Sequence, residues 1–202
     1  YQRLRERGVP LVTVNGNAPT IKAPGFATDD RRATRMAVDH LIALGHQRIG
    51  LAMGPMRMVP AQRKRSGYED AMREGLPEEP LRIVETLYTY EGGISAALHL
   101  LEQGCTGIVC SSDVMALGVV HGVRQTGRSV PHDVSVIGYD DSPLIPMTDP
   151  PLTTVRQPVG SICRAAVSTL LAQLDGERPT DTEMLFAPDL IVRDSTAAAF
   201  ID

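Results

Sequence analysis

Residues 107–141 read GIVCSSDVMALGVVHGVRQTGRSVPHDVSVIGYDD, and their pattern points to one class of fold. Two short apolar runs, Gly107–Cys110 and Val134–Tyr139, predict buried strands. Between them, Val114–Gln125 has the apolar spacing of a helix, and Gly127 marks the end of that helix. Because a strand, a helix and a strand follow one another without a tight hairpin turn, the two strands should lie parallel in one sheet.

The same alternation continues on both sides of this stretch. Further strands are expected at 10–14, 48–53 and 83–87, with a short extended stretch at 185–192, and further helices at 1–7, 30–44, 61–74, 94–102 and 161–174. The proline-rich segment 141–158 breaks the rhythm and should run as extended chain from one lobe to another. The sequence therefore predicts an α/β fold in which helices cover both faces of parallel sheets.

The composition excludes several classes of protein. With 20 Lys and Arg against 24 Asp and Glu, the 202 residues carry a net charge of −4, so this chain should not bind a phosphate backbone by itself. No apolar run approaches the roughly 18 residues that cross a bilayer, so no membrane partner is expected. The opening YQRLRERGVP lacks the apolar core of a secretory signal. Because it begins without Met and within a predicted helix, we expect the sequence to be a fragment.

The three cysteines favour free thiols. Cys105, Cys110 and Cys163 are odd in number and form no CxxC pair, and the five histidines supply no close partner for a zinc site. Unpaired thiols are typical of a reducing compartment, which favours the cytoplasm. The sequence predicts no metal site and no cofactor.

Charged side chains gather where the predicted strands end. They are Asp29, Asp30, Asp113, Asp140 and Asp141, with the cations Arg63, Lys64 and Arg65 at the head of a predicted helix. Ligands of open parallel sheets bind beyond the carboxyl ends of the strands, so these residues are candidates for a binding site. Each Asp could instead cap a helix, and the cations could form a solvated first turn. Acidic and basic groups together suit a ligand rich in hydroxyl groups, such as a sugar.

Signatures of common enzymes are weak in this sequence. It has neither a GxxxxGK[ST] pattern nor a GxGxxG pattern after a strand. The segment 93–97, GISAA, only faintly resembles a nucleophile elbow because the second Gly is missing. Asp113, Asp140 and Asp141 could hold Mg²⁺ for phosphoryl transfer, but the chain has few lysines to complete such a site. A magnesium-dependent phosphotransfer enzyme stays an alternative, and a protein that is not an enzyme is favoured.

Several segments together resemble one family, the LacI/GalR bacterial transcription regulators. The resembling segments are LIALGHQRI (41–49), RSGY (65–68), SDVMALG (112–118), VPHDVSVIGYDD (130–141), PPLTTVRQP (150–158) and IVRDS (191–195). They occur in the order that the family shows, and they cover nearly the whole chain.

The resemblance implies a periplasmic-binding-protein-like fold of type I, in which two α/β lobes close on a small molecule, commonly a sugar or a nucleobase. By the topology of the family, the N-terminal lobe comprises residues 1–54 and 158–180, and the C-terminal lobe comprises residues 55–157 and 181–195. The first strands of the N-terminal lobe are missing, so that lobe is incomplete and has an unpaired sheet edge. The family's helix-turn-helix DNA-binding domain is also absent from this chain.

The resemblance also implies functional residues and partners. Effector contacts transfer to Asp29, Lys64, Asp113 and Asp140. Arg63 is a further candidate, because the family has an arginine at position 64 and lysine lacks its planar fork. The implied function is an effector-sensing domain that forms a homodimer, in part through residues 114–123, and alters operator DNA affinity through the missing domain. A secreted sugar-binding protein of an uptake system shares the fold and stays an alternative.

Overall fold

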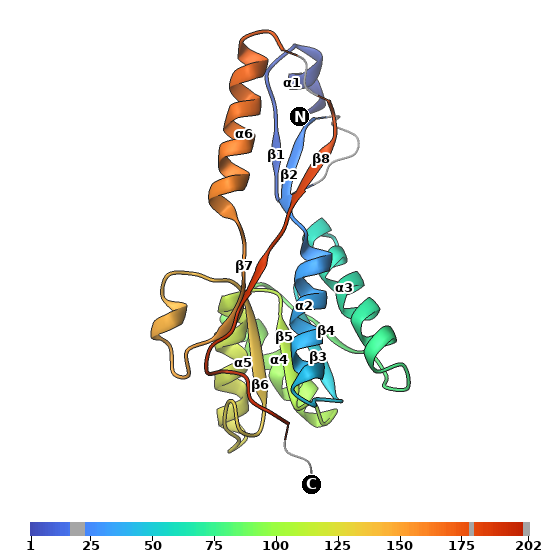
Figure 1. Cartoon of the computed structure of the whole chain (residues 1–202), viewed down its shortest axis with the longest axis vertical. Coiled ribbons are helices and arrows are strands. Elements are labelled where there is room, and N and C mark those ends of the chain that lie inside the picture. Colours follow the sequence, from blue (N-terminus) through green and yellow to red (C-terminus); the bar gives the residue numbers. More distant parts are fainter. Residues whose placement is uncertain (17–22, 178–179, 200–202) are drawn as a thin grey trace. The chain divides into compact units, whose positions relative to one another are not determined.

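The computed structural model describes residues 1–16, 23–177 and 180–199, and the chain divides into two compact units. Unit 1 comprises Tyr1–Asp29 and Pro158–Pro188, and unit 2 comprises Asp30–Gln157 and Asp189–Asp202 (Figure 1). The chain therefore passes between the units at three points. None of the described helices is both long and apolar enough to cross a bilayer.

Unit 1 is built on three parallel strands. These are β1 (Thr13–Val14), β2 (Gly25–Thr28) and β8 (Glu183–Phe186), in the order β1-β2-β8, and its helices are α1 (Gln2–Glu6) and α6 (Val159–Leu174). α6 runs alongside β1 and β2 (Figure 1), and Phe26, Ile162 and Ala166 form a small core there. The Gln173 side chain accepts a hydrogen bond from the Leu11 N–H and donates one to the Leu11 carbonyl, which ties α6 to the chain before β1.

Unit 2 contains a larger sheet of six strands in the order β4-β3-β5-β6-β7-β9. The strands are β3 (Ile49–Met53), β4 (Arg82–Glu85), β5 (Gly107–Cys110), β6 (Ser135–Asp140), β7 (Thr153–Arg156) and β9 (Asp189–Ile191). Neighbouring strands are parallel except β9, which runs antiparallel to β7. The helices are α2 (Asp30–Ala43), α3 (Val59–Gly75), α4 (Tyr90–Glu102) and α5 (Asp113–Gln125), with a 3₁₀ turn η1 (Ile145–Met147).

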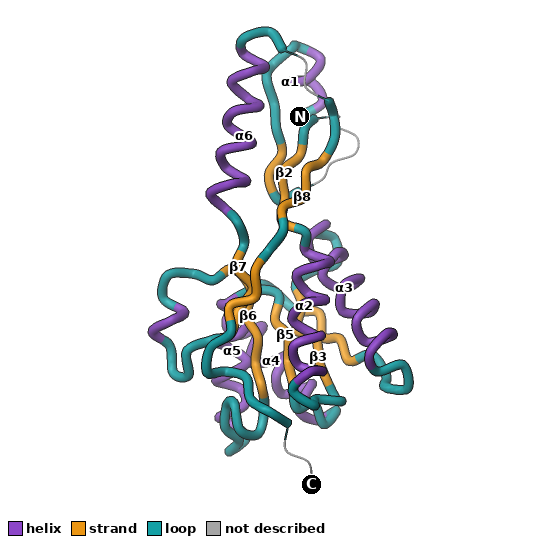
Figure 2. Tube along the Cα trace, in the orientation of Figure 1, coloured by secondary structure: helices purple, strands orange, loops and turns teal. Residues whose placement is uncertain are grey.

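The helices of unit 2 cover both faces of its sheet (Figure 2). Leu51 of β3 packs into a core with Leu41 of α2 and Tyr68 of α3. The next residue, Ala52, belongs to the core that α4 and α5 complete, because successive side chains of a strand point to opposite faces. β3 and β5 are buried along their whole length, which explains their continuous apolar sequences. The predicted α/β fold with parallel sheets flanked by helices is confirmed.

Glycines allow α4 and α5 to approach each other closely. A Cβ on Gly118 would lie 2.0 Å from the carbonyl oxygen of Tyr90, and a Cβ on Gly93 would lie 2.1 Å from the carbonyl oxygen of Met115. A larger residue at either position would have to displace backbone. The two glycines therefore set the spacing of the helices and fix the start of α5, which carries Asp113.

The structure differs from the division into lobes that the sequence predicts. Residues 30–54 lie in unit 2 rather than with the first lobe, because β3 is hydrogen-bonded between β4 and β5 and α2 packs against α3. Residues 181–188 lie in unit 1 rather than with the second lobe, because β8 pairs with β2. β2 itself was not predicted, and β7 and η1 lie within the segment that was expected to be extended chain.

Candidate functional site

The carboxyl edge of the unit 2 sheet brings together several of the predicted site residues. β3, β5 and β6 are parallel, so Gly54, Ser111–Asp113 and Asp140 lie where neighbouring strands end. Asp30 of α2 and Lys64 of α3 reach the same edge, as the contacts below show.

Lys64 is the centre of this group although its side chain is almost fully buried. Its Nζ donates a hydrogen bond to the Ser111 carbonyl at 3.1 Å and lies 3.6 Å from Asp30 Oδ1. The same ammonium is 3.5 Å from the ring centroid of Tyr139 and 6.0 Å from that of Tyr88. Burial lowers the pKa of Lys64, and the charge of Asp30 opposes this shift. Lys64 is therefore a buried cation held by a carboxylate, a carbonyl and an aromatic face.

Asp30 accepts a hydrogen bond on the same oxygen that faces Lys64. The Tyr139 hydroxyl donates to Oδ1 at 2.5 Å, so a cation and a phenol share one carboxylate oxygen. Burial raises the pKa of Asp30, while the charge of Lys64 and the Tyr139 hydrogen bond act against that rise. Burial and the charge of Asp30 also raise the pKa of Tyr139, so the phenol keeps its proton and remains a donor. We refer to Lys64, Asp30 and Tyr139 as the Lys64 trio.

Asp140 ends β6 in a strained backbone conformation. Its φ is +121°, in a region where residues with side chains cost about 1–3 kcal/mol. Gln157 Nε2 donates to Asp140 Oδ1 at 2.7 Å, and the residue remains accessible to solvent. Partial enclosure by protein raises the pKa of Asp140, while the Gln157 hydrogen bond and the charge of Lys64 oppose the rise. An accessible carboxylate on a backbone held under strain is a good candidate for ligand contact.

Asp113 is enclosed by protein, with only 1% of the residue exposed. Its Oδ2 accepts hydrogen bonds from the Ser142 N–H at 2.8 Å and the Ser142 hydroxyl at 2.7 Å. Its Oδ1 accepts from the Thr154 hydroxyl at 2.6 Å. Three of the roughly four hydrogen bonds that a carboxylate can accept are thus made within the protein. This geometry suits a positioning role, in which Asp113 ties α5 to the chain after β6 and to β7.

Asp141, the other carboxylate at the end of β6, is held by two arginines. Arg156 Nε and Arg193 Nη2 each lie 2.6 Å from one of its oxygens, and Arg193 also donates to the Leu152 carbonyl at 2.7 Å. Burial acts to raise the pKa of Asp141, but the hydrogen bonds and charges of the two arginines outweigh it and lower that pKa. These contacts fix the backbone next to Asp140.

The other two predicted residues have different positions. Asp29 is the last residue of the first segment of unit 1, where its N–H donates to the Phe186 carbonyl at 2.9 Å. In the chain it directly precedes Asp30 of the Lys64 trio. Arg63 stands next to Lys64 on α3 and is half-buried. Its charge helps to lower the pKa of Asp30, with a smaller effect than that of Lys64.

Tyr139 and Tyr88 were not predicted as residues of the site. Tyr139 was counted with the apolar run of β6, although an aromatic residue beside a carboxylate at a strand end is a usable signal. The Tyr88 ring lies against Gly54, where a Cβ would be 2.0 Å from a ring carbon. Next to this group, the Ser111 hydroxyl is buried and has no hydrogen-bond partner among the described residues.

This arrangement suits recognition of hydroxyl groups better than catalysis. A carboxylate accepts from hydroxyls, an ammonium donates to their oxygens, and an aromatic ring covers an apolar face of the ligand. In the parts of the chain that the structure describes, no three His, Cys, Asp or Glu side chains gather to hold a metal ion. Burial raises the pKa of the Cys105 thiol to about 11 and also raises that of Cys110, which leaves both thiols poor nucleophiles.

The fold and the site together define a class: an α/β ligand-binding protein of two units, with polar and aromatic side chains at the carboxyl edge of a parallel sheet. A family model described as a periplasmic binding protein-like domain matches residues 38–196. An uncharacterised HTH-type transcriptional regulator in the aml 5′ region of Streptomyces limosus is 54% identical over 201 residues, which cover 98% of this chain and 57% of the relative.

Two solved structures are similar over nearly the whole chain. One is a LacI family transcriptional regulator from Enterococcus faecium with bound ribose, with a TM-score of 0.89 and 27% identity, covering 98% of this chain and 74% of that one. The other is a complex of the transcriptional regulator CelR with cellobiose, with a TM-score of 0.88 and 31% identity, covering 96% of this chain and 61% of that one. This chain belongs to the LacI/GalR family of transcriptional regulators and contains its periplasmic binding protein-like domain. It spans somewhat more than half the length of the curated relative.

Proposed function

We propose that this chain is the effector-sensing domain of a LacI/GalR-type transcription regulator and that the effector is a sugar. The observation that carries the proposal is the Lys64 trio beside the accessible carboxylate of Asp140. An ammonium has three donor hydrogens. Lys64 donates one to the Ser111 carbonyl and forms an ion pair with Asp30 at 3.6 Å, so it keeps donor capacity for a ligand oxygen. The related structures whose descriptions name ribose and cellobiose support a sugar as the ligand class.

Within this proposal the predicted residues have different roles. Lys64 and Asp140 contact the effector, and Asp113 holds the segment that carries Asp140. Arg63 adds positive charge beside Lys64. Asp29 stays a proposed effector contact.

The proposed consequence of binding is a change in the affinity of the whole protein for operator DNA. The DNA contact is made by a helix-turn-helix domain of the longer protein, and the regulator acts as a homodimer to which residues 114–123 contribute. It acts in the cytoplasm, where the operator lies, and catalyses no reaction. Couplings between such sites typically amount to about 1–3 kcal/mol, or roughly 5–150-fold in affinity.

A thermal-shift screen against monosaccharides, oligosaccharides, polyols and purine nucleosides tests the ligand class. At a concentration of about 100 times its Kd, a ligand stabilises the protein by about 2.7 kcal/mol. We expect a sugar to raise the melting temperature. A shift produced by a nucleoside and by none of the sugars would contradict the proposal.

A further inference from the structure

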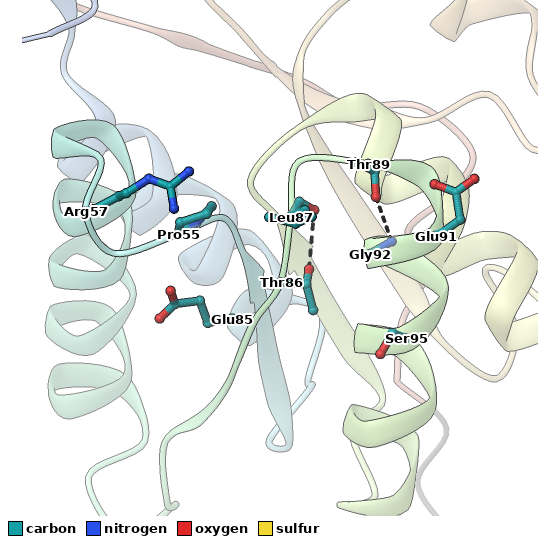
Figure 3. A pocket seen from close by; sticks show the side chains of 9 residues that line it. All are labelled: Pro55, Arg57, Glu85, Thr86, Leu87, Thr89, Glu91, Gly92 and Ser95. Atoms are coloured by element: carbon teal, nitrogen blue, oxygen red, sulfur yellow. Dashed lines mark hydrogen bonds between the residues drawn. The ribbon is translucent and has the colours of Figure 1, made fainter.

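A cavity lies on unit 2, beyond the ends of β3 and β4. Its volume is about 610 Å³, within the range of small-molecule sites. We call it the β4 pocket; the lining residues used below are Pro55, Arg57, Glu85, Leu87, Thr89 and Glu91. In Figure 3, Pro55 and Arg57 lie on one side of the pocket, Thr89 and Glu91 lie on the other, and Leu87 stands between them.

Tyr88 connects this pocket to the proposed effector site. Its chain neighbours Leu87 and Thr89 line the pocket, while its own ring lies against Gly54 and 6.0 Å from Lys64 Nζ. The β4 pocket therefore adjoins the Lys64 trio through the segment 87–89, whose outer residues line the pocket and whose Tyr88 ring lies near Lys64.

The side chains of the pocket suit a neutral group with many hydroxyls. Two carboxylates, Glu85 and Glu91, disfavour an anionic ligand, and the guanidinium of Arg57 disfavours a cationic one. Leu87, which is 60% exposed, offers apolar surface of the kind that covers the face of a sugar ring.

The polar groups of this pocket also have unused hydrogen-bonding capacity. One Glu85 oxygen accepts from the Met56 N–H, which holds the loop after β3 in place, and Thr89 accepts from the Gly92 N–H. The side chains of Arg57 and Glu91 form no hydrogen bond or ion pair with any other residue that the structure describes. They can therefore bind a ligand without breaking a contact.

We propose that the effector is an oligosaccharide, with one sugar ring at the Lys64 trio and the next ring in the β4 pocket. The inference rests on the proposed function and makes it more specific. Successive rings of an oligosaccharide are joined directly, so they need two adjoining polar sites. The segments 54–55 and 87–89 connect the two sites, because Gly54 and Tyr88 lie toward the Lys64 trio and Pro55, Leu87 and Thr89 line the pocket. A monosaccharide would use only the first of the two sites.

Calorimetric titration tests this with glucose and galactose as monosaccharides and with maltose, cellobiose, lactose and maltotriose as oligosaccharides. We expect one of the oligosaccharides to bind about tenfold more tightly than either monosaccharide. Arg57→Ala and Glu91→Gln should each lower the ratio of oligosaccharide to monosaccharide affinity about fivefold, the usual size of one lost hydrogen bond. Glu102→Gln, an exposed change at the other end of α4, is the matched control and should leave the ratio unchanged.

The results separate the two proposals. A monosaccharide that binds as tightly as every oligosaccharide would overturn the inference and leave the sugar-binding function standing. The inference would also be overturned, with the sugar-binding function still standing, if Arg57→Ala and Glu91→Gln left the ratio of oligosaccharide to monosaccharide affinity unchanged. If no sugar of either length binds, the proposed function itself fails and the inference fails with it.

Discussion

At the scale of single residues, a carboxylate can bind a ligand when its oxygens are accessible and still able to accept hydrogen bonds. A carboxylate whose oxygens are already occupied within the protein positions other groups instead. Asp113 accepts three hydrogen bonds from Ser142 and Thr154 and is buried, whereas Asp140 accepts one from Gln157 and stays accessible. Both residues follow strands and both match a family contact in sequence. The structure gives them different surroundings, so their substitution should have different consequences.

Asp113→Ala should destabilise the fold far more than Asp140→Ala. The first change leaves the Ser142 N–H and the Thr154 hydroxyl without their acceptor, at a cost of about 3 kcal/mol. The second removes an accessible group from a strained position and should change stability by less than about 1 kcal/mol. Urea unfolding of both variants measures the difference. Equal losses, or a larger loss for Asp140→Ala, would argue against the positioning role.

The sequence could predict part of the site, because strand ends are visible as the points where apolar runs stop. Asp140 was predicted at the sheet edge in this way, whereas Lys64 was a candidate at the head of a predicted helix and through the family resemblance. The burial of Lys64 was not predictable, since Arg63, Lys64 and Arg65 resemble a solvated turn and only the packing of α3 directs the middle one toward Tyr139. The hydrogen bonds that occupy the Asp113 carboxylate could not be predicted either, because their donors lie 29 and 41 positions away in the chain.

At the scale of elements, close contacts between helices position the edge that carries the site. α4 and α5 meet at Gly93 and Gly118, and α2 meets α3 where a Cβ on Gly67 would lie 2.1 Å from the Arg31 carbonyl oxygen. His46 adds a polar tie, because its ring contacts the hydroxyls of Thr106 and Ser135 at 3.0 Å each. The positions of the helices in unit 2 are therefore set by close contacts between their backbones as well as by the burial of apolar side chains.

Gly118→Ala should destabilise the protein by about 1–3 kcal/mol, because the added Cβ would meet the Tyr90 carbonyl oxygen at 2.0 Å and the backbone would have to move. Gly160→Ala in α6 is the matched control. Its Cβ would meet only the flexible end of Arg164, at 3.3 Å, and alanine favours helix by up to about 1 kcal/mol. Urea unfolding compares the two. The glycine account fails if Gly118→Ala is as stable as Gly160→Ala.

Stability should fall as the pH drops below about 6.5, in part through His46. Burial lowers the pKa of His46 in the folded protein, so the unfolded chain binds the proton more readily. The stability that this group contributes is therefore present above the unfolded pKa and is lost as the pH falls through the folded pKa.

Urea unfolding at pH 7.5 and pH 5.5 measures this loss, and the loss should be smaller in His46→Gln than in wild type. His132→Gln, an exposed change, is the control and should leave the loss unaltered. An identical pH dependence in wild type and His46→Gln would show that His46 does not contribute. Burial also lowers the pKa of His40, so some dependence should remain in His46→Gln.

Most elements of unit 2 could be predicted from the sequence, because its buried strands are continuous apolar runs between amphipathic helices. β2 was missed because its four residues, Gly25–Thr28, begin with glycine and show no apolar alternation. The assignment of 30–54 to the first lobe was wrong for a different reason. The pairing of β3 with β4 and β5 is a contact between distant segments, and the local pattern of 48–53 is the same in either lobe.

At the scale of the whole molecule, the two units have unequal cores. Unit 2 has two large buried clusters, one on each face of its sheet, whereas the described core of unit 1 is a small cluster around Phe26, Ile162 and Ala166. Several large apolar side chains of unit 1 are exposed, including Val167, Leu171 and Leu174 of α6. A region with few buried apolar contacts unfolds locally at a lower free energy than a region with many. Local unfolding should therefore cost less free energy in unit 1 than in unit 2.

Native-state hydrogen exchange should show this difference directly. Amides of β3, β5 and β6 should exchange only through global unfolding, and those of β2 and β8 should exchange through smaller openings at lower free energy. Deuterium uptake followed by mass spectrometry on peptides from each unit gives the comparison. Slower exchange in β2 than in β5 would be incompatible with the packing of the two cores.

Calorimetric titration of wild type and Asp140→Asn with the best sugar from the screen tests the central claim most directly. The variant keeps the size of the side chain and removes its charge. A hydrogen bond to a charged group is worth about 1.5–3 kcal/mol, so the account predicts a loss of roughly tenfold or more in affinity, with the melting temperature of the free protein little changed. A folded Asp140→Asn variant that binds the sugar as tightly as wild type would contradict a site at this edge of the unit 2 sheet.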